Sequence, residues 1–518
     1  MNLTLRSIAL GFILSALSVH AALVVPTIFN DGMVLQRDRA ITVWGWAEPG
    51  ARVAVEFAAF KAAATAGADG RWETQLPAQP ASASGRDLII QAGSETRRLR
   101  DVRVGDVWLL AGQSNMGWSV DQSAEAEAAK ARANYPWLRA FTQLPFEGAA
   151  DQPVKDVTGG IWKTATPATA GSFSAVGFYF AEALQPHLEK NVPVALIHTA
   201  MGGTSIESWI DRASLEALPA GRIGAKFYRD EVGVSLKKNA EWYAAKAAWQ
   251  QQADAAKAVG KPAPAMDKSL AKEPAGLKSY HLPSVLFNGK VAPLQPFALR
   301  GVVWYQGEGN ATSTDAAKRY ADLLPLLIER WRAGFRDPAL PFLIVQLPGF
   351  NPPGKWADWP EMRAQQAAVC ARVPATALVV TLDLGERDNI HPTHKQPVGE
   401  RAALVARKLV YGEAALADQG PRFLSAARTG SAIRITFTHT GALSTRDAAA
   451  PTGFAVAGAD GNAIPAAARI EGDAIVVTVP ATLQGPVTVS YAWKNWPEAN
   501  VADATGMPLM AFRTPAQP

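Results

Sequence analysis

The sequence has only one cysteine, Cys370, so no disulfide can form within the chain. Cys370 follows the apolar residues 367–369, a context that predicts a buried thiol. A cysteine nucleophile would also need a histidine partner, and the sequence marks none out. We therefore expect the folded chain to be held together by burial and hydrogen bonding alone.

The chain also lacks a strong charge of one sign. Its 51 Lys and Arg residues are set against 46 Asp and Glu residues, which leaves a formal net charge of +5. That excess is small for this length and does not predict binding to nucleic acid or to an anionic membrane. No cluster of His, Cys and carboxylate residues has metal-ligand spacing, so we expect no metal and no cofactor. Nothing in the sequence indicates an obligate protein partner.

Long apolar runs are missing as well, because none reaches the roughly 20 residues that a membrane-spanning helix needs. A shorter apolar stretch at 8–17 follows Arg6 and precedes Val19-His20-Ala21, a small-x-small cleavage pattern. We therefore expect a cleaved signal peptide at residues 1–21 and a secreted or periplasmic mature protein with no membrane span. An uncleaved N-terminal anchor is the alternative.

Short apolar runs separated by turn signals begin the mature chain. The runs at 41–46 and 53–57 flank Glu48-Pro49-Gly50, a pattern typical of β-strands joined by tight turns. We therefore expect a β-rich N-terminal domain at residues 22–103. A similar pattern near the C-terminus predicts a β-sandwich-like domain at residues 419–518. The sequence leaves open whether these two parts form one joint domain or two.

Between these parts, continuous apolar runs alternate with helical stretches. Continuous runs are typical of strands that are covered on both faces, and their alternation with helices predicts an α/β domain with a parallel sheet. We assign residues 104–418 to this domain. The expected strands are 107–111, 193–198, 299–304, 342–346 and 377–381, and the expected helices are 124–133, 317–331 and 360–371.

An insertion at residues 225–280 interrupts the alternation of strands and helices. The stretch 241–259 is rich in Ala, Lys and Gln and is expected to be helical, and a proline-containing irregular return follows it. The insertion is either a lid over the functional site or a surface decoration.

A serine stands where the first buried strand of the α/β domain should end. Ser114 lies in Gly112-Gln113-Ser114-Asn115-Met116, between that strand and an expected helix. Ligands bind at the carboxyl edge of open α/β sheets, and a helix N-terminus offers N–H groups to a developing oxyanion. A serine that only caps the helix is the alternative.

A histidine and an aspartate occur together after the last expected strand, in Asp388-Asn389-Ile390-His391-Pro392. Histidine can activate a serine hydroxyl as a general base, and a carboxylate can hold its imidazole in the reactive tautomer. The pair Asp388 and His391 can supply both groups from one loop. His394 is a competing base, and Asp383 is an alternative carboxylate.

Two further segments follow expected strands at the same edge. In Trp304-Tyr305-Gln306-Gly307-Glu308-Gly309-Asn310, either Gln306 or Asn310 can donate a hydrogen bond to an oxyanion. In the glycine-containing segment at 202–209, the backbone N–H of Gly203 is another candidate donor. A phosphate-binding loop is the alternative for this segment, and the missing Lys-Ser/Thr ending of that motif argues against it.

These four segments, in this order, resemble those of the SGNH hydrolases, and in particular the sialate O-acetylesterase branch. The matching sequences are Gly-Gln-Ser-Asn-Met at 112–116, Gly-Gly-Thr with a downstream Trp at 202–209, Trp-Tyr-Gln-Gly-Glu at 304–308 and Asp-x-x-His-Pro at 388–392. Similar stretches at 30–36, 287–289 and 491–500 extend the resemblance over most of the mature chain. Members often carry Ser where this chain has Gly309, a departure that concerns a secondary contact and leaves the triad intact.

The resemblance implies an SGNH-type three-layer sandwich with a parallel central sheet, flanked by all-β domains, that acts as a serine acetylesterase. The implied site residues are Ser114 as nucleophile, His391 as base, Asp388 as the carboxylate that orients His391, and an oxyanion hole made of the Ser114 N–H, Gly203 and an amide of Gln306 or Asn310. Aromatic faces suit the apolar faces of sugar rings. We expect substrate contacts from Gln113, Trp209, Trp304 and Glu308, and further tryptophans at 118, 356 and 359 lie in or near the expected edge loops.

Three functions agree with these motifs. The first is a carbohydrate O-acetylesterase, whose substrate is an acetylated sialic acid or an acetylated hemicellulose such as xylan or xyloglucan. The second is a carbohydrate-binding protein with an idle hydrolase core, and the third is a general short-chain esterase or lipase of the same superfamily. The sequence names neither the glycan nor the acetyl position.

Overall fold

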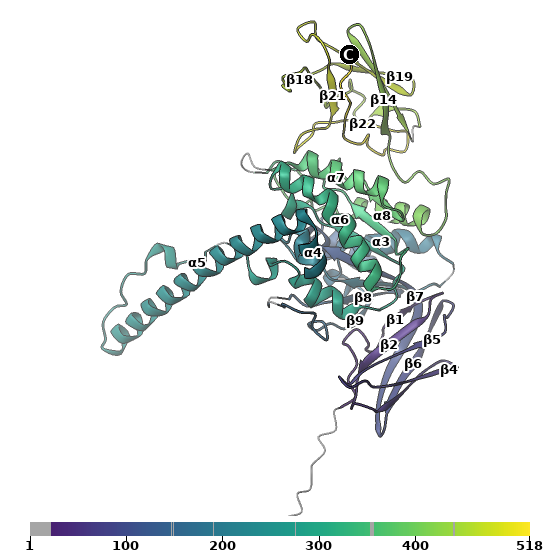
Figure 1. Ribbon diagram of the computed structural model, residues 1–518, viewed down its shortest axis with the longest axis vertical. Helices are drawn as coiled ribbons and strands as arrows, with labels where there is room; N and C mark the ends of the chain where they lie inside the picture. The colour runs from purple at the N-terminus through teal and green to yellow at the C-terminus, as the bar shows by residue number, and fades with distance from the viewer. Residues whose placement is uncertain are drawn as a thin grey trace, which may run out of the picture.

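A computed structural model describes residues 22–146, 148, 150–189, 191–274, 276–352, 357–438 and 441–518. The expected signal peptide, residues 1–21, lies outside the described residues and stays a prediction. Figure 1 shows a central α/β body with one β body below it and another above it, so the N- and C-terminal β parts are two separate domains. Within the described ranges, no helix is both long and apolar enough to cross a bilayer.

The central sheet confirms the α/β fold class with a parallel sheet. Its strand order is β13-β12-β11-β7-β10-β8-β9, and every neighbouring pair is parallel except β8 and β9 at one edge. Its strands are β7 (Glu95–Gly112), β8 (Tyr135–Thr142), β9 (Trp162–Ala165), β10 (Val194–His198), β11 (Gly301–Tyr305), β12 (Phe342–Val345) and β13 (Thr376–Val379).

Helices cover both faces of this sheet, because side chains alternate along its strands. In β7, Trp108 and Leu110 join a core with helices α3 and α8, whereas Val107 and Leu109 join a core with helices α6 and α7. The result is the expected three-layer sandwich. The helices are α1 (Ser114–Gly117), α2 (Ala126–Arg132), α3 (Ala175–Leu184), α4 (Arg212–Ala217), α5 (Pro219–Ala258), α6 (Thr314–Gly334), α7 (Trp359–Arg372) and α8 (Gln396–Leu409).

Strand β7 connects the N-terminal domain to the α/β domain without a linker. Its first part pairs with β6 and β1, and its second part, from Asp106, pairs with β10 and β11. The boundary that the sequence suggests between residues 103 and 104 therefore falls inside one continuous strand. The other strands of the N-terminal domain are β1 (Val34–Gln36), β2 (Ile41–Trp46), β3 (Arg52–Phe57), β4 (Phe60–Thr65), β5 (Arg71–Leu76) and β6 (Ser82–Ala92).

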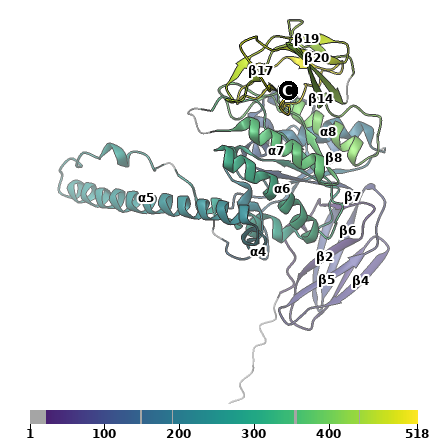
Figure 2. The same ribbon diagram turned by 45° about the horizontal axis from the view of Figure 1, so that its top comes forward.

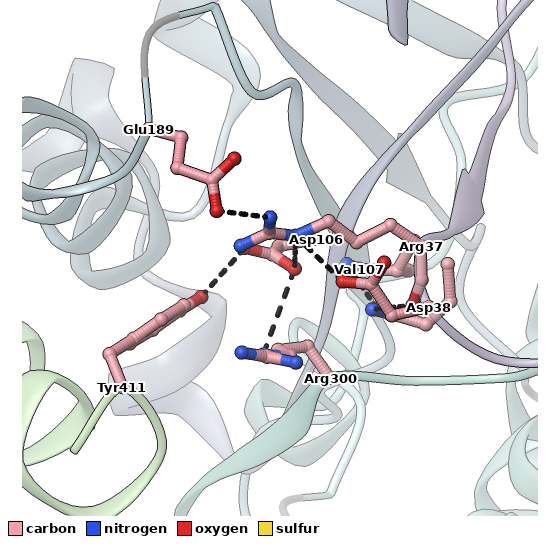
Figure 3. A network of polar contacts seen from close by, with 8 residues as sticks. Arg37, Asp38, Asp106, Val107, Glu189, Arg300 and Tyr411 are labelled. Atoms are coloured by element: carbon pink, nitrogen blue, oxygen red, sulfur yellow. Dashed lines mark hydrogen bonds and ion pairs between the residues drawn. The ribbon is translucent and has the colours of Figure 1, made fainter. Parts of the chain in front are cut away.

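A buried carboxylate fixes the junction between these two domains (Figure 3). Asp106 is fully buried, and Arg37 of the N-terminal domain reaches it with an Nε–Oδ1 distance of 2.9 Å. Tyr411, beyond α8, donates its hydroxyl to the other carboxylate oxygen at 3.0 Å, and Arg300 lies 3.7 Å from the first. The paired cations offset the cost of burying the Asp106 carboxylate, so this network of buried polar contacts can hold the two domains in a defined arrangement.

The C-terminal domain contains two four-stranded sheets, ordered β14-β15-β20-β19 and β18-β17-β21-β23, and a two-stranded sheet of β16 and β22. It is tied to the α/β domain by Asp383, which pairs with both Arg401 and Arg446, and by Arg363, which donates to the carbonyls of Ala492 and Lys494. Its strands are β14 (Arg422–Thr429), β15 (Ala432–Thr438), β16 (Ser444–Thr445), β17 (Phe454–Ala457), β18 (Ala463–Pro465), β19 (Ala468–Glu471), β20 (Ala474–Thr478), β21 (Thr488–Tyr491), β22 (Val501–Ala502) and β23 (Phe512–Arg513).

The insertion forms an arm that projects from the α/β domain (Figures 1 and 2). Its helix α5 begins at Pro219, whereas the sequence pattern predicts a helix only from residue 241. The chain then returns along the helix: Trp242 Nε1 donates to Ser269 O at 3.0 Å, and Trp249 Nε1 donates to Pro264 O at 3.0 Å. These hydrogen bonds from the two indole N–H groups hold the return segment against α5.

Candidate active site

A close approach between two central strands positions Ser114. Strand β7 ends at Gly112, whose φ of +134° and contact with β11 leave no room for a side chain, since a Cβ there would lie 2.1 Å from Tyr305 O. The next residue, Gln113, donates its N–H to Tyr305 O at 3.0 Å. Ser114 then begins helix α1, so its own N–H has no acceptor within the helix and is available to a ligand.

The loop after β13 brings His391 to Ser114, although the two residues are 277 positions apart. The distance from His391 Nε2 to Ser114 Oγ is 2.8 Å, within hydrogen-bonding reach. Both side chains are half-buried, so the pair borders solvent. This geometry places a base on the hydroxyl, as general-base activation of a serine requires.

Trp118 stacks on the imidazole of His391, with ring centroids 4.7 Å apart and planes 20° from parallel. Its indole N–H donates to Gln122 O at 2.8 Å, which fixes the ring in this position. Burial, followed by the positive charge of Lys395, lowers the pKa of His391 below its ordinary value of 6.5. The imidazole is therefore neutral, and able to accept a proton, over a wider pH range than a free histidine.

The structure does not bring Asp388 to the imidazole. Asp388 is exposed, and within the described part of the chain it makes no hydrogen bond or ion pair. The other carboxylates of this loop are engaged: Asp383 pairs with Arg401 and Arg446, and Glu386 accepts bonds from Thr393 N at 2.6 Å and from Asn389 Nδ2 at 2.8 Å. Asp388 is thus the free carboxylate among these three.

The competing base is held elsewhere. His394 is exposed, and its Nδ1 lies 2.6 Å from Glu125 Oε1. Since His391 and not His394 contacts Ser114, the geometry favours His391 as the base.

A buried polar network that the motif analysis does not identify joins the serine segment to the histidine segment. Asn115 Nδ2 donates to Glu308 Oε1 at 2.5 Å and to Ile390 O at 3.0 Å, while its Oδ1 accepts from Lys395 Nζ at 2.5 Å. Burial lowers the pKa of Lys395 to about 7 and raises the pKa of Glu308. Because Asn115 flanks Ser114 and Ile390 flanks His391, this network ties the two reacting residues together.

Glu308 and Gln113, which the sequence predicts as substrate contacts, are both almost fully buried. Glu308 is 9% exposed and bonds Asn115, so its carboxylate supports the network described above. Gln113 is 3% exposed, and its Oε1 accepts from Gly309 N at 3.1 Å. Its Nε2 has no partner in the described ranges, so one donor of Gln113 remains free.

The glycine turn after β10 lies against the nucleophile. A Cβ on Gly202 would lie 3.4 Å from the Cβ of Ser114, which shows how closely the turn approaches. Gly203 follows in the left-handed region with φ of +74°, a conformation that favours glycine. The turn therefore places the backbone of residue 203 beside the serine, where an oxyanion donor is expected.

The structure distinguishes between the two candidate amides of the third segment. Gln306 is fully buried, and its Nε2 donates to Thr204 O at 3.1 Å and to Asn310 Oδ1 at 2.9 Å. Both amide protons are used, so the expectation that Gln306 donates to an oxyanion is corrected. Asn310 Nδ2 donates to Glu207 Oε2 at 2.9 Å, which leaves its second proton available.

Two tryptophans that the sequence predicts as sugar contacts are core residues. Trp209 and Trp304 are fully buried and pack edge to face, with centroids 5.8 Å apart, beside Trp331. A fully buried ring cannot touch a substrate, so this expectation is wrong. Trp359 is also buried, at 3% exposure, and Trp356 lies outside the described residues.

No cluster of three or more His, Cys, Asp and Glu side chains that could hold a metal ion occurs in the described residues. The lone thiol of Cys370 is half-buried, and burial raises its pKa to about 12. Cys370 is therefore a poor nucleophile, as its sequence context predicts.

The lowered pKa of His391 has a measurable consequence for the pH profile. Hydrolysis should require neutral His391, so kcat/KM for 4-nitrophenyl acetate should rise with pH through a midpoint below 6.5. Lys395 is still protonated in that range. Replacing Lys395 by Gln removes this charge, raises the pKa of His391 and moves the acid limb to higher pH.

The control for this profile is His394→Gln, which removes the neighbouring exposed histidine. The acid limb should keep its position in that variant. The assignment of the acid limb to His391 would be refuted if the limb shifted in His394→Gln. It would also be refuted if the limb kept its position in Lys395→Gln.

Comparisons with known proteins agree with this geometry. A family model described as carbohydrate esterase, sialic acid-specific acetylesterase, matches residues 104–232 and 283–407. Human sialate O-acetylesterase is 30% identical over 431 residues, which cover 76% of this chain and 72% of the relative. The protein of the same name from Rattus norvegicus is 31% identical and covers 76% of this chain and 74% of the relative.

A solved structure extends the likeness to the whole fold. A novel carbohydrate acetylesterase from Xanthomonas citri superposes with a TM-score of 0.78 and 36% sequence identity, over 95% of this chain and 100% of that chain. The two segments matched by the family model leave out residues 233–282, which contain the outer part of α5 and its return.

Proposed function

Because the chain belongs to the sialic acid-specific acetylesterase family of carbohydrate esterases, and is itself a carbohydrate O-acetylesterase, we propose that Ser114 and His391 carry out its acetyl transfer. The observation that carries this proposal is the 2.8 Å contact between Ser114 Oγ and His391 Nε2 at the carboxyl edge of the sheet. An intact hydroxyl–imidazole pair favours an active enzyme over a carbohydrate-binding protein with an idle core.

The reaction proceeds in two acyl-transfer steps. His391 Nε2 takes the Ser114 proton as Oγ forms a bond to the acetyl carbonyl carbon, and the carbonyl oxygen becomes an oxyanion. When the tetrahedral intermediate collapses, the bond to the sugar oxygen breaks and the leaving oxygen takes the proton from His391. Water, deprotonated by the same imidazole, then attacks the acetyl-enzyme and releases acetate with regeneration of Ser114.

We assign three donors to the oxyanion. They are the N–H of Ser114 at the start of α1, the N–H of Gly203 in the turn beside the nucleophile, and the remaining amide proton of Asn310. Preorganised donors of this kind lower the barrier because they need no reorientation as charge develops. We assign the amide position to Asn310, since both amide protons of Gln306 are already bonded.

The role of orienting carboxylate falls to Asp388. It lies in the same loop as His391, and the two other carboxylates of that loop are held by arginines or by hydrogen bonds within the loop. The imidazolium that forms during each step needs a negative partner at Nδ1. Asp388 makes no hydrogen bond or ion pair with another described residue, so no existing contact holds its carboxylate away from this role.

The acetyl group and the sugar define the substrate classes to test: acetylated sialic acid, and acetylated hemicellulose such as xylan or xyloglucan. The purified enzyme should release acetate from acetylated glycans and should prefer 4-nitrophenyl acetate to the butyrate and octanoate esters. A lipase would instead have a long acyl pocket and prefer the longer chains. A preference for octanoate would assign the chain to that class.

We further propose that residues 1–21 direct export, which places the enzyme outside the cytoplasm with Ala22 as its first residue. The support is the positively charged start, the apolar stretch at 8–17 and the cleavage pattern that ends at Ala21.

A further inference from the structure

The half-buried ring of Trp118 covers one face of the proposed base. Trp118 caps the C-terminus of helix α1, four positions after Ser114. Its ring stacks on the imidazole of His391 with centroids 4.7 Å apart and planes 20° from parallel. Because the two planes are nearly parallel, the imidazole lies against the face of the indole and not against its edge. The face of an aromatic ring carries negative partial charge and attracts cations, and tryptophan does so most strongly.

Trp118 is held in this position by two hydrogen bonds that do not involve His391. Its backbone carbonyl accepts from Ala175 N at 2.8 Å, and its indole Nε1 donates to Gln122 O at 2.8 Å. The first bond fixes the main chain, and the second fixes the ring. The indole face is therefore in place before the imidazole takes a proton, and a preorganised group needs no reorientation as charge develops.

The imidazole of His391 has few other partners that could stabilise a positive charge. Its Nε2 lies 2.8 Å from Ser114 Oγ, and its Nδ1 makes no hydrogen bond with a described residue. Asp388 is exposed and does not contact the ring in this part of the chain. When Nε2 takes the Ser114 proton, the indole of Trp118 is thus the electron-rich group that the described structure places against the new cation.

The charged groups on the elements around the imidazole do not take over this role. Burial, followed by the cation of Lys395, lowers the pKa of His391, so both oppose the imidazolium. Arg387, in the same loop as His391, is exposed. The other charged side chains of these elements have partners of their own: Glu308 with Asn115, Glu386 with Thr393 and Asn389, His394 with Glu125, and Asp121 with Lys130.

From this geometry we propose that Trp118 is a positioning residue that stabilises the cationic form of His391 in each acyl-transfer step. In the first step the proton of Ser114 Oγ passes to Nε2 while Oγ bonds to the acetyl carbon, and the positive charge spreads over a ring that already lies on the indole face. The same contact acts when the imidazole deprotonates water in the second step. The proposal rests on the proposed function, with Ser114 as nucleophile and His391 as base.

The test replaces Trp118 by Leu, which keeps an apolar side chain against the imidazole but removes the aromatic face. The plateau of kcat/KM for 4-nitrophenyl acetate should fall about two- to thirtyfold, mainly through kcat, because the cation loses its aromatic partner. The pKa of His391 in the free enzyme should fall too, so the acid limb should move to lower pH by roughly 0.4 to 1.5 units. A purely structural defect would leave the limb in place, and hydration of the imidazole would move it to higher pH.

Trp118→Phe separates the aromatic face from the indole N–H. Phenylalanine keeps a weaker aromatic face but cannot donate to Gln122 O, so both effects should have the same sign as in Trp118→Leu and be smaller. The matched control is Trp137→Leu, because Trp137 stacks on Tyr135 at the amino end of β8, away from the carboxyl edge. Its plateau and limb should match those of the wild type. Melting temperatures are measured for all variants, and Trp118→Phe carries the test if the Leu variant does not fold.

An acid limb that stays in place or moves to higher pH in the folded Trp118 variants would overturn this role. Equal losses in Trp118→Leu and Trp118→Phe would also overturn it, since the indole hydrogen bond and not the ring face would then be responsible. A loss confined to KM for an acetylated sugar would make Trp118 a substrate contact instead. Wild-type turnover in Ser114→Ala, by contrast, would overturn the reaction on which the proposal rests.

Discussion

Replacing Ser114 by Ala should reduce kcat for acetyl ester hydrolysis by about 10⁵- to 10⁶-fold, the loss seen when the nucleophile of a serine hydrolase is removed. The variant cannot form the acetyl-enzyme, and only the oxyanion donors and substrate binding continue to assist attack by water. Ser114 is half-buried, and among the described residues its hydroxyl bonds only His391, so the fold should be unaffected. The measurements are kcat for 4-nitrophenyl acetate and the melting temperature by circular dichroism.

Ser119→Ala is the matched control for this prediction. Ser119 follows the nucleophile by five positions, and within the described ranges its hydroxyl bonds only Gln122, at the start of the next helical turn. Its activity should remain close to that of the wild type. Turnover near the wild-type level in Ser114→Ala, with the fold intact, would remove Ser114 from the mechanism.

Replacing Asp388 by Asn should lower kcat by about 10²- to 10⁴-fold, the upper figure being the cost of the same change in a serine protease triad. Asn can still hydrogen-bond, but it neither stabilises the imidazolium nor enforces the tautomer with the proton on Nδ1. Because Asp388 is exposed and has no partner in the described ranges, the variant should be as stable as the wild type. A loss of kcat without a loss of stability is the expected signature.

Glu386→Gln provides the contrast within the same loop. Glu386 accepts bonds from Thr393 and Asn389, so this change should lower the melting temperature and reduce kcat less than tenfold. If Asp388→Asn kept more than half of the wild-type kcat, the enzyme would work with a Ser114–His391 pair alone. The active site would then need no orienting carboxylate, because Trp118 and the loop alone would hold the imidazole in place.

Much of the fold is predictable from local sequence, because buried parallel strands must be apolar along their whole length. The five expected strands of the α/β domain coincide with parts of β7, β10, β11, β12 and β13. Strand β8 and helices α3 and α8 have no counterpart among the expected elements. Strand β8 begins with Tyr135-Pro136-Trp137, and α3 is apolar on nearly every side. Neither element therefore shows the hydrophobic periodicity by which a strand or a helix is predicted.

The arm helix α5 is another element whose full extent the local sequence does not predict. The Ala- and Lys-rich stretch marks only its outer half, whereas its first half contains Gly221, Gly224 and Gly233, which local propensity disfavours in a helix. Gly221 and Gly224 pack directly against Leu215 and Glu207, where no side chain fits. Tertiary contact therefore favours glycine at positions that look unsuited to a helix.

The sequence by itself determined the fold class, the family and the serine and histidine segments, because apolar runs and short motifs are local features of the chain. Only the tertiary structure decided that Trp209 and Trp304 are core residues. It also decided that both amide protons of Gln306 are already hydrogen-bonded. The same holds for the network of Asn115, Glu308 and Lys395, which joins the serine segment to the histidine segment. Burial and hydrogen-bond partners depend on residues that are hundreds of positions apart. They are therefore settled only when the chain has folded.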